Sequence, residues 1–311
     1  MDRQEMFVGI DVSKDRLDVH VHPSGEAFAC ARDAEGLDQL LAWFGPVKPM
    51  LVAIEATGGF ETVAAAHLAA AGLPVAVVNP AQVRAFATAL GKRAKTDPID
   101  ALVIAHFAAT ARPHPKPAPD ETLQALADLT TRRRQIVAMI GAEKQREKRA
   151  PARLRKSIAR LLKALQKELS EVEADIDDTM RGSPLWREKE ELLTSVPSIG
   201  QTIARALLAD LPELGELDRR QIAALAGLAP HTRQSGQWKG HSFISGGRSE
   251  PRSSLFIAAM VAIRHNPPLK AFYLRLTAAG KAKKLALIAV ARKLLTILNA
   301  ILRDKKPWQH A

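Results

Sequence analysis

The sequence predicts an α/β domain at the N-terminus, then a long helical arm, and finally a C-terminal domain that is mainly α-helical. Short apolar runs alternate with helical patterns over residues 1–112, whereas residues 121–190 carry apolar side chains at helical spacings and no strand pattern. Four prolines within residues 113–119 separate the two patterns, because proline cannot continue a helix. We therefore divide the chain into residues 1–112, a linker and helical arm over 113–190, and a C-terminal domain over 191–311.

The first domain opens with three strand patterns. Residues 7–12 form an apolar run, residues 16–22 alternate polar and apolar side chains, and residues 27–31 follow a turn. Helices are then predicted at about 34–45, 62–71 and 81–90, and strands at 50–54 and 75–78. Three antiparallel strands followed by alternating helices and strands predict a mixed sheet with helices on its faces. That order matches the RNase H architecture.

The arm has its clearest helical pattern over residues 158–176. The apolar spacing there fits a helical hairpin or coiled coil with Glu and Lys pairs on the exposed face. A plain bundle helix explains the pattern almost as well. The run at residues 149–151 ends in proline and interrupts the pattern, so we expect two helices in the arm.

The C-terminal domain begins with a segment that resembles a helix-hairpin-helix. Residues 196–200 precede a helix at 202–208, and such a hairpin points backbone amides and a helix N-terminus toward a phosphate without reading base sequence. Further helices are predicted at 222–228, 254–264 and 284–302, with a loop rich in Gly, Ser and basic residues over 230–253.

Charge is distributed unevenly along the chain, whose net charge is +12. Residues 1–112 contain 10 Lys and Arg against 13 Asp and Glu, a net of −3, whereas residues 231–311 contain 15 against 2, a net of +13. The basic C-terminal end favours a polyanionic partner such as nucleic acid, although ribosomal, membrane-surface and solubilising segments share that composition.

The composition also narrows the class of protein. Cys30 is the single cysteine, which excludes an intramolecular disulfide framework and a four-cysteine zinc site. The apolar stretches are broken by Gly, Pro or charge before the roughly 18 residues that a membrane span needs. The N-terminus shows a strand pattern with Asp and Lys and not a signal peptide. We therefore expect a cytoplasmic protein with no membrane partner.

Four acidic residues stand at the ends of predicted elements. Asp11 ends the first strand and Glu55 ends the fourth, and in an RNase H-like sheet these strands are neighbours, which places both carboxylates at one edge of a cleft. In the DPID run at residues 97–100, Asp97 fits a helix cap and Asp100 the first turn on the same face. That run alone is explained by capping, but together with Asp11 and Glu55 it suits hard divalent ions such as Mg²⁺.

A serine in the basic loop is a candidate nucleophile. Ser235 precedes a glycine, and most such serines are turn residues. Serine can nonetheless attack a DNA phosphodiester if its proton is removed and a cation offsets the developing charge. Arg233, Lys239 and Arg248 are candidates for that role or for ordinary phosphate contacts. Six more basic residues fit either a solvated face or, as the local charge favours, a nucleic-acid groove: Arg264, Lys281, Lys283, Lys284, Arg292 and Lys293.

Several short motifs occur in order along the chain. They are GIDVSK at 9–14, IEATG at 54–58, VNP at 78–80, KTDPIDA at 95–101, AGLAP at 226–230, NP at 266–267, AFY at 271–273, RL at 275–276, AGK at 279–281 and ARKLL at 291–295. Together they resemble the insertion-sequence transposases with a DEDD motif and a RuvC-like domain, the IS110 family, which includes pilin-gene invertase relatives and bridge-RNA-guided recombinases. The chain departs from that pattern at His231, where relatives commonly carry Arg, and at Ser253, Ser254 and Phe256, where Arg and Tyr are frequent.

The resemblance implies that Asp11, Glu55, Asp97 and Asp100 bind Mg²⁺ and that Ser235 forms a covalent link to a DNA end. It implies Mg²⁺-dependent strand exchange between double-stranded donor and target DNA, guided by a structured bridge RNA. It also implies a homodimer, joined through the coiled-coil arm, that assembles into a homotetramer in which the acidic site of one subunit meets the serine of another. Such a protein would act at the nucleoid of a prokaryotic cell.

Two other classes of protein fit the same sequence. A RuvC-like metal-dependent nuclease or Holliday-junction resolvase uses water as the nucleophile and needs only the four carboxylates, so Ser235→Ala would leave its cleavage intact. A non-catalytic nucleic-acid-binding protein relies on the helix-hairpin-helix and the basic end, so Asp11→Asn or Glu55→Gln would leave its activity intact.

Overall fold

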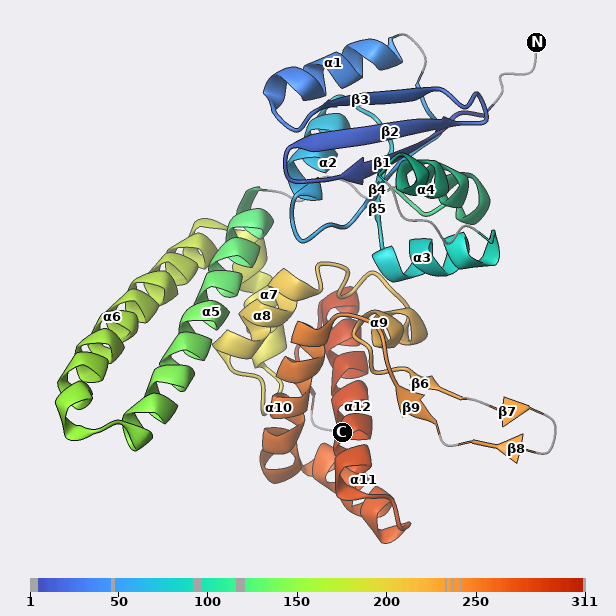
Figure 1. Ribbon diagram of the computed structural model, residues 1–311. Helices are drawn as coiled ribbons and strands as arrows, with labels where there is room; N and C mark the ends of the chain where they lie inside the picture. The colour runs from blue at the N-terminus through green and yellow to red at the C-terminus, as the bar shows by residue number, and fades with distance from the viewer. Residues whose placement is uncertain are drawn as a thin grey trace. The chain divides into compact units, whose positions relative to one another are not determined.

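The chain forms two compact units, Met1–Pro119 and Asp120–Ala311. The computed structural model describes residues 5–45, 48–91, 97–115, 121–232, 234–235, 238–240 and 242–309. The first unit combines a sheet with helices and the second is mostly helical, as the sequence predicts (Figure 1).

A five-stranded mixed sheet forms the first unit. Its strands are β1 (Phe7–Val12), β2 (Arg16–His22), β3 (Ala27–Ala31), β4 (Leu51–Glu55) and β5 (Val75–Val78), in the spatial order β3-β2-β1-β4-β5. The strands β1, β2 and β3 pair antiparallel, and β4 and β5 continue the sheet parallel to β1. The predicted mixed sheet is therefore confirmed, and β4 alone is displaced, by one residue.

Four helices cover the two faces of this sheet. They are α1 (Ala34–Phe44), α2 (Glu61–Ala70), α3 (Pro80–Ala89) and α4 (Asp97–Ala111). Successive side chains of a strand point to opposite faces, so β1 directs Val8, Ile10 and Val12 into a core that α1 and α2 close. Phe7 points the other way, into a second core that α3 and α4 close. The odd-numbered residues of β1 therefore face α4.

Gly9 allows α4 to pack directly on β1. A Cβ atom at this position would lie 2.2 Å from the backbone nitrogen of Ala105 and 2.4 Å from the carbonyl oxygen of Ala101. No real Cβ atom approaches backbone so closely, so any side chain here would push the helix away from the sheet.

We expect Gly9→Ala to lower the free energy of unfolding of the first unit by about 3 kcal/mol, because the added methyl group overpacks the helix against the sheet. Urea unfolding followed by circular dichroism measures the change. The control is Gly141→Ala in a helix of the second unit, where nothing lies within 4 Å of the new Cβ atom. That substitution should stabilise its unit by about 0.5–1 kcal/mol. An unchanged midpoint for Gly9→Ala would contradict the close packing.

The helix α4 runs antiparallel to β1. His106 of α4 contacts His22, the cross-strand partner of Phe7, with ring centroids 4.4 Å apart. Arg112, just beyond the helix, places its guanidinium carbon 5.4 Å from the ring centroid of Phe7. The C-terminal half of α4 thus lies beside the start of β1. The helix crosses Gly9 at Ala101 and Ala105, before it reaches His106. Its first turn therefore lies at the carboxyl end of β1.

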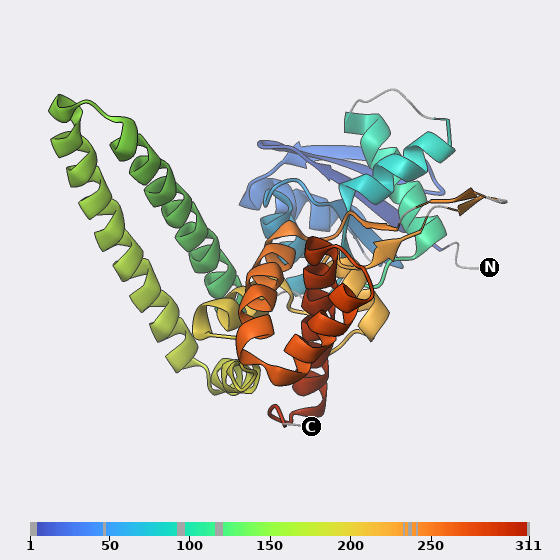
Figure 2. The ribbon, with the colours of Figure 1, turned by 90° about the horizontal axis from the view of Figure 1, so that it is seen from below.

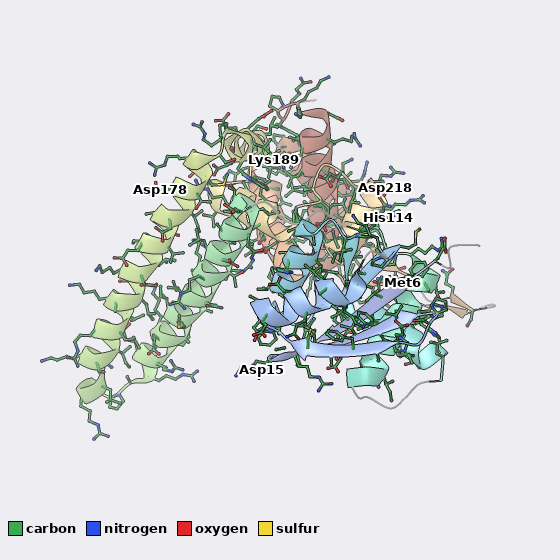
Figure 3. The ribbon with its side chains drawn as sticks, turned by 90° about the horizontal axis from the view of Figure 1, so that it is seen from above. Met6, Asp15, His114, Asp178, Lys189 and Asp218 are labelled. Atoms are coloured by element: carbon green, nitrogen blue, oxygen red, sulfur yellow. The ribbon has the colours of Figure 1, made fainter. Side chains whose placement is uncertain are left out.

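The second unit begins with two long helices that lie side by side, α5 (Glu121–Arg149) and α6 (Ala152–Gly182), followed by α7 (Pro184–Thr194). The predicted interruption falls between α5 and α6, so the expectation of two helices is confirmed. Figures 1 and 2 show that this α5–α6 hairpin extends beyond the other helices of the unit. Charged side chains such as the exposed Asp178 project from it into solvent (Figure 3).

The base of the α5–α6 hairpin shares one hydrophobic core with the rest of the second unit. The other helices are α8 (Gln201–Asp210), α9 (Arg219–Leu225), α10 (Ser249–His265), α11 (Pro267–Ala278) and α12 (Lys283–Asp304). Leu126, Ile136 and Ile176 of the hairpin belong to the same buried cluster as side chains of α8, α10 and α12. These shared buried side chains therefore anchor the base of the hairpin to the other helices of the second unit.

The sequence predicts no helix at α11, and the structure corrects this. Asn266 caps the helix, because its side chain accepts a hydrogen bond from the backbone N–H of Leu269, and Pro267 occupies the first helical turn. The prolines that end one helical pattern in the sequence therefore begin the next helix.

The helix α12 is long and apolar enough to cross a membrane by length and composition, with a mean hydropathy of 2.0 over 18 residues. Half of that window is buried inside the second unit. Its buried side chains, Leu294, Leu295 and Leu298 among them, belong to the core of the unit. It is the core helix of a folded unit and not a membrane span.

The sequence predicts a loop over residues 230–253, and the structure shows that this prediction was wrong. The described residues of this segment up to Ile244 form a two-stranded ribbon, in which β6 (Pro230–His231) pairs with β9 (Phe243–Ile244) and β7 (Gln234–Ser235) pairs with β8 (Trp238–Lys239). We call the described residues between Pro230 and Ile244 the serine ribbon. It projects from the helical part of the second unit (Figure 1), and α10 begins at Ser249, earlier than predicted.

Candidate active site

Asp11, the last residue but one of β1, and Glu55, the last residue of β4, lie at the carboxyl ends of neighbouring parallel strands. The strands β1 and β4 pair in register as far as Ile10 and Ile54, so the two acidic residues follow at one level of the sheet, where adjacent strands lie about 4.8 Å apart. Ile10 and Ile54 point into the core under α1 and α2, which directs both acidic residues to the face that α4 covers. Both side chains are half-buried. The backbone thus brings these two positions together.

The helix α4 brings Asp100 to the same end of the sheet, because its first turn lies at the carboxyl end of β1. Asp100 is half-buried in that turn. Asp97 is the first residue of the helix, but its side chain lies outside the described part of the structure, as do residues 92–96. Three of the four predicted acidic side chains are therefore placed at one end of the sheet.

A further carboxylate, to which no motif pointed, lies beside this group. Asp18 of β2 is the cross-strand partner of Asp11 and is only 5% exposed. The Nε atom of Arg16 lies 3.1 Å from both of its carboxylate oxygens, and Nη2 lies 2.7 Å from Oδ1. The polar alternation along β2 was the available signal, since it places residues 16, 18 and 20 on one face. Because Arg16 neutralises it, we treat Asp18 as a structural neighbour of the acidic group.

The chemistry of Asp11, Glu55 and Asp100 fits a hard divalent cation, because carboxylate oxygens are the ligands that Mg²⁺ prefers. Among the side chains that the structure describes, no three acidic, histidine or cysteine groups lie close enough to form a metal site. The positive end of the α4 dipole points at the same end of the sheet and offsets part of the repulsion between the carboxylates. The backbone positions thus suit a divalent cation. The described side chains do not by themselves form a complete site for it.

Ser235 lies in β7, opposite Trp238 of β8, and its side chain is exposed. A nucleophile must reach the phosphodiester, and an exposed position on a projecting ribbon satisfies that requirement. Arg233 lies outside the described residues, and so does the side chain of Lys239. Their predicted roles beside the serine therefore stay predictions.

Arg248 is engaged in the fold. Its guanidinium donates to the two carboxylate oxygens of Glu213, at 2.7 and 2.9 Å, and to the carbonyl oxygen of Asp210 at 2.9 Å. Glu213 is buried, so this bidentate pair stabilises the chain at the start of α10. Arg248 therefore has a structural role in the unit, and its predicted phosphate contact stays a prediction.

The other predicted nucleic-acid contacts lie on or beside α10 and α12. Arg292 is half-buried, and the exposed ones are Arg264, Lys281, Lys283, Lys284 and Lys293. These cations are open to solvent, so a polyanion can reach them.

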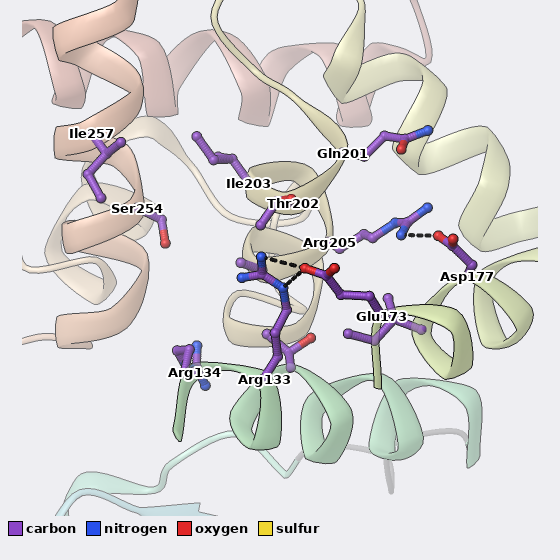
Figure 4. Close-up of a pocket in the computed structure, with 13 residues that line it drawn as sticks. Arg133, Arg134, Glu173, Asp177, Gln201, Thr202, Ile203, Arg205, Ser254 and Ile257 are labelled. Atoms are coloured by element: carbon purple, nitrogen blue, oxygen red, sulfur yellow. Dashed lines mark hydrogen bonds and ion pairs between the residues drawn. The ribbon is translucent and has the colours of Figure 1, made fainter. Parts of the chain in front are cut away.

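A pocket of about 480 Å³ lies between the base of the α5–α6 hairpin and the helices α8 and α10 (Figure 4). Arg133 of α5 donates to Glu173 of α6 at 2.9 Å, and Arg205 of α8 pairs with Asp177 of α6. Arg205 also donates to Glu190 of α7 at 2.6 Å, and these partners raise its pKa although burial acts to lower it. The described arginines that line this pocket already form ion pairs, and two of these pairs join the hairpin to the rest of the unit. Among the described residues, the pocket therefore offers no unpaired arginine to a ligand.

Arg134→Ala should lower the free energy of unfolding of the second unit by about 2 kcal/mol, because it leaves the largely buried Asp210 without an ion pair 2.5 Å long. Burial already raises the pKa of Asp210, against the opposing effect of Arg134. The control is Arg132→Ala on the same helix, whose 3.6 Å pair with Glu168 is about half exposed on both sides. Its loss should cost below about 0.5 kcal/mol. Equal losses in urea unfolding would contradict the assignment.

Two family models match the chain. One, described as a transposase and named for the DEDD transposases of IS110, matches residues 8–150. The other, described as the transposase IS116/IS110/IS902 family, matches residues 190–274. The first match contains all four predicted acidic residues and the second contains Ser235.

Curated relatives match over both units. The chain is 28% identical to the pilin gene-inverting protein of Moraxella bovis over 316 aligned residues, which cover 97% of each chain. The pilin gene-inverting protein of Moraxella lacunata matches to the same extent. The 43.6 kDa protein of insertion element IS110 from Streptomyces coelicolor is 31% identical over 150 residues, which cover 48% of this chain and 36% of that protein.

Proposed function

Because the chain belongs to the IS110 family of transposases and is a DNA recombinase, we propose that it exchanges strands of double-stranded DNA through a covalent phosphoserine bond at Ser235. The observation that supports this most is the exposed position of Ser235 on a projecting ribbon inside the stretch that the second family model matches. In the attack, the hydroxyl oxygen of Ser235 bonds to phosphorus, its proton passes to a base, and one deoxyribose oxygen leaves. The phosphoserine diester replaces the broken phosphodiester, so a hydroxyl of another DNA strand can reverse the step without an external energy source.

We also propose that Asp11, Glu55, Asp97 and Asp100 hold Mg²⁺. When bound, the cation would polarise a phosphate oxygen and offset its charge. Support comes from the carboxylate pair at the end of β1 and β4 and from the first turn of α4 above it. The strand order β3-β2-β1-β4-β5 supports an RNase H-like, RuvC-like fold for this unit.

The proposed partners are donor and target DNA, a structured bridge RNA and further copies of the chain. The basic end of the chain, with its net charge of +13 over residues 231–311, supports contacts with both nucleic acids. Leu154 and Leu161 lie seven residues apart on α6 and are about half exposed, at 48% and 46%. Their heptad spacing supports a coiled-coil contact between hairpins in a dimer that assembles into a tetramer. We expect the protein to act in the bacterial cytoplasm, at the nucleoid.

A metal-dependent nuclease or Holliday-junction resolvase is the second candidate function. The carboxylate pair on adjacent strands favours it, because hydrolysis by metal-activated water needs no serine.

The test incubates the protein with Mg²⁺, with end-labelled DNA that carries the native flanks of its gene, and with RNA transcribed from those flanks. A denaturing gel then separates free DNA from DNA bound to protein. We expect labelled DNA that migrates with the protein and is released by protease. Cleaved DNA without attached protein would assign the resolvase function instead.

A further inference from the structure

The serine ribbon joins the helical part of its unit through two turns, one after α9 and one before α10. The glycines of these turns touch: a Cβ atom at Gly247 would lie 2.2 Å from the backbone nitrogen of Gly227. Both have a positive φ, 63° for Gly227 and 65° for Gly247, which glycine adopts most readily. The two turns therefore pack backbone to backbone, and together they form what we call the ribbon root.

Arg252, in the first turn of α10, crosses the ribbon root. Its Nη1 atom donates to the carbonyl oxygen of Gly246 at 2.7 Å and to that of Gly227 at 3.3 Å. Gly227 precedes the first strand of the ribbon and Gly246 follows the last one. One guanidinium thus joins the chain that enters the ribbon to the chain that leaves it.

The position of Arg252 is itself tightly defined. A Cβ atom at Gly227 would lie 2.1 Å from the same Nη1 atom, so the guanidinium fills the space that the glycine leaves. Arg248 adds a restraint nearby, because its backbone N–H donates to the carbonyl oxygen of Leu225 at 2.7 Å. His231 and Ser245 form a further contact above the root, 3.3 Å between Nε2 and the carbonyl oxygen.

We propose that Arg252 is a positioning residue that fixes the direction of the serine ribbon and thereby the place of Ser235, a role that rests on the proposed function. The ribbon contributes two short ladders of two residue pairs each, so its direction depends on its root. A small rotation at the ribbon root moves the distant hydroxyl group of Ser235 farther than it moves the root itself. A misplacement of about 1 Å can slow a reaction by roughly 100-fold.

The first experiment measures the mobility of the serine ribbon and does not depend on recombination activity. A nitroxide attached to Ser235→Cys in the full chain, with Cys30→Ala removing the natural cysteine, reports the mobility of the ribbon. We expect Arg252→Ala to raise that mobility and Arg252→Lys to restore part of the order, because an ammonium group also donates to carbonyl oxygens. The control Arg219→Ala removes an exposed arginine from the start of α9 and should change nothing. An unchanged spectrum for Arg252→Ala overturns the proposal.

The second experiment measures the rate of covalent adduct formation with Ser235 intact. Arg252→Ala should slow it by about 10- to 100-fold, with little change in DNA affinity or thermal midpoint, and free guanidinium ions should recover part of the rate. A wild-type rate, or an equal loss of DNA affinity, overturns the positioning role. An absence of adduct in the wild type overturns the proposed function instead, and the nitroxide spectra then decide whether Arg252 orders the ribbon.

Discussion

Replacing Ser235 by alanine is expected to abolish the covalent protein–DNA adduct and to slow strand exchange by at least about 1,000-fold. A methyl group cannot attack phosphorus, and no other group in the proposed mechanism accepts the DNA strand. Because Ser235 is exposed on the serine ribbon, its hydroxyl contributes little to the fold, so DNA affinity should persist. Adduct yield on a denaturing gel and binding by fluorescence anisotropy separate the two effects.

Ser245→Ala is the matched control for the loss of a hydroxyl. Ser245 lies next to β9 and is exposed, and its contact with His231 uses the backbone carbonyl oxygen, which alanine keeps. The control should form adduct at the wild-type rate. Undiminished cleavage by Ser235→Ala would make water the nucleophile and favour a resolvase.

Asp11→Asn should slow DNA cleavage on the order of 100- to 1,000-fold while DNA binding stays unchanged. The substitution keeps the size of the side chain but removes the charge that holds a divalent cation, and the lost stabilisation of several kcal/mol corresponds to that factor. Cleavage rates measured across a series of Mg²⁺ concentrations check this, because a variant with a weaker site needs more metal.

Asp15→Asn is the control for the charge change. Asp15 lies in the exposed turn after β1, and its backbone carbonyl accepts a hydrogen bond from the N–H of Arg32 that asparagine preserves. It should cleave DNA at the wild-type rate. Wild-type cleavage by Asp11→Asn would instead remove the acidic group from the reaction and point to a role in folding alone.

The strands and helices of the first unit could be predicted because each buried element carries a regular pattern. Apolar residues alternate in β2 and fill β1 and β4, and turns separate the strands. The VNP motif also has a local explanation, since the side chain of Asn79 accepts a hydrogen bond from the N–H of Ala81 and Pro80 starts α3.

The second unit was harder to predict, since tertiary contacts decide its irregular parts. The serine ribbon consists of two-residue ladders that leave no periodic signal, and its root depends on the contact between Gly227 and Gly247. The helix α11 was missed because its double proline ends a helix as readily as it begins one.

For the candidate site, the sequence indicated positions but not side-chain partners. The placement of Asp11 and Glu55 follows from strand order, which patterns predict. Arg248 pairs with Glu213, which is far away in the sequence, and Arg252 bonds to both turns of the ribbon root. Composition alone does not indicate either contact. The metal-binding role of the acidic residues and the nucleophilic role of Ser235 stay predictions.

The direction of α4 has a consequence for the metal-free protein. Its N-terminus gives the acidic end of the sheet a permanent partial positive charge of about half an elementary charge, supplied by peptide groups. This charge offsets part of the repulsion among the acidic residues whether or not a cation is bound. If they bind Mg²⁺ as proposed, the ion adds its charge to the one that the peptide groups of α4 already supply.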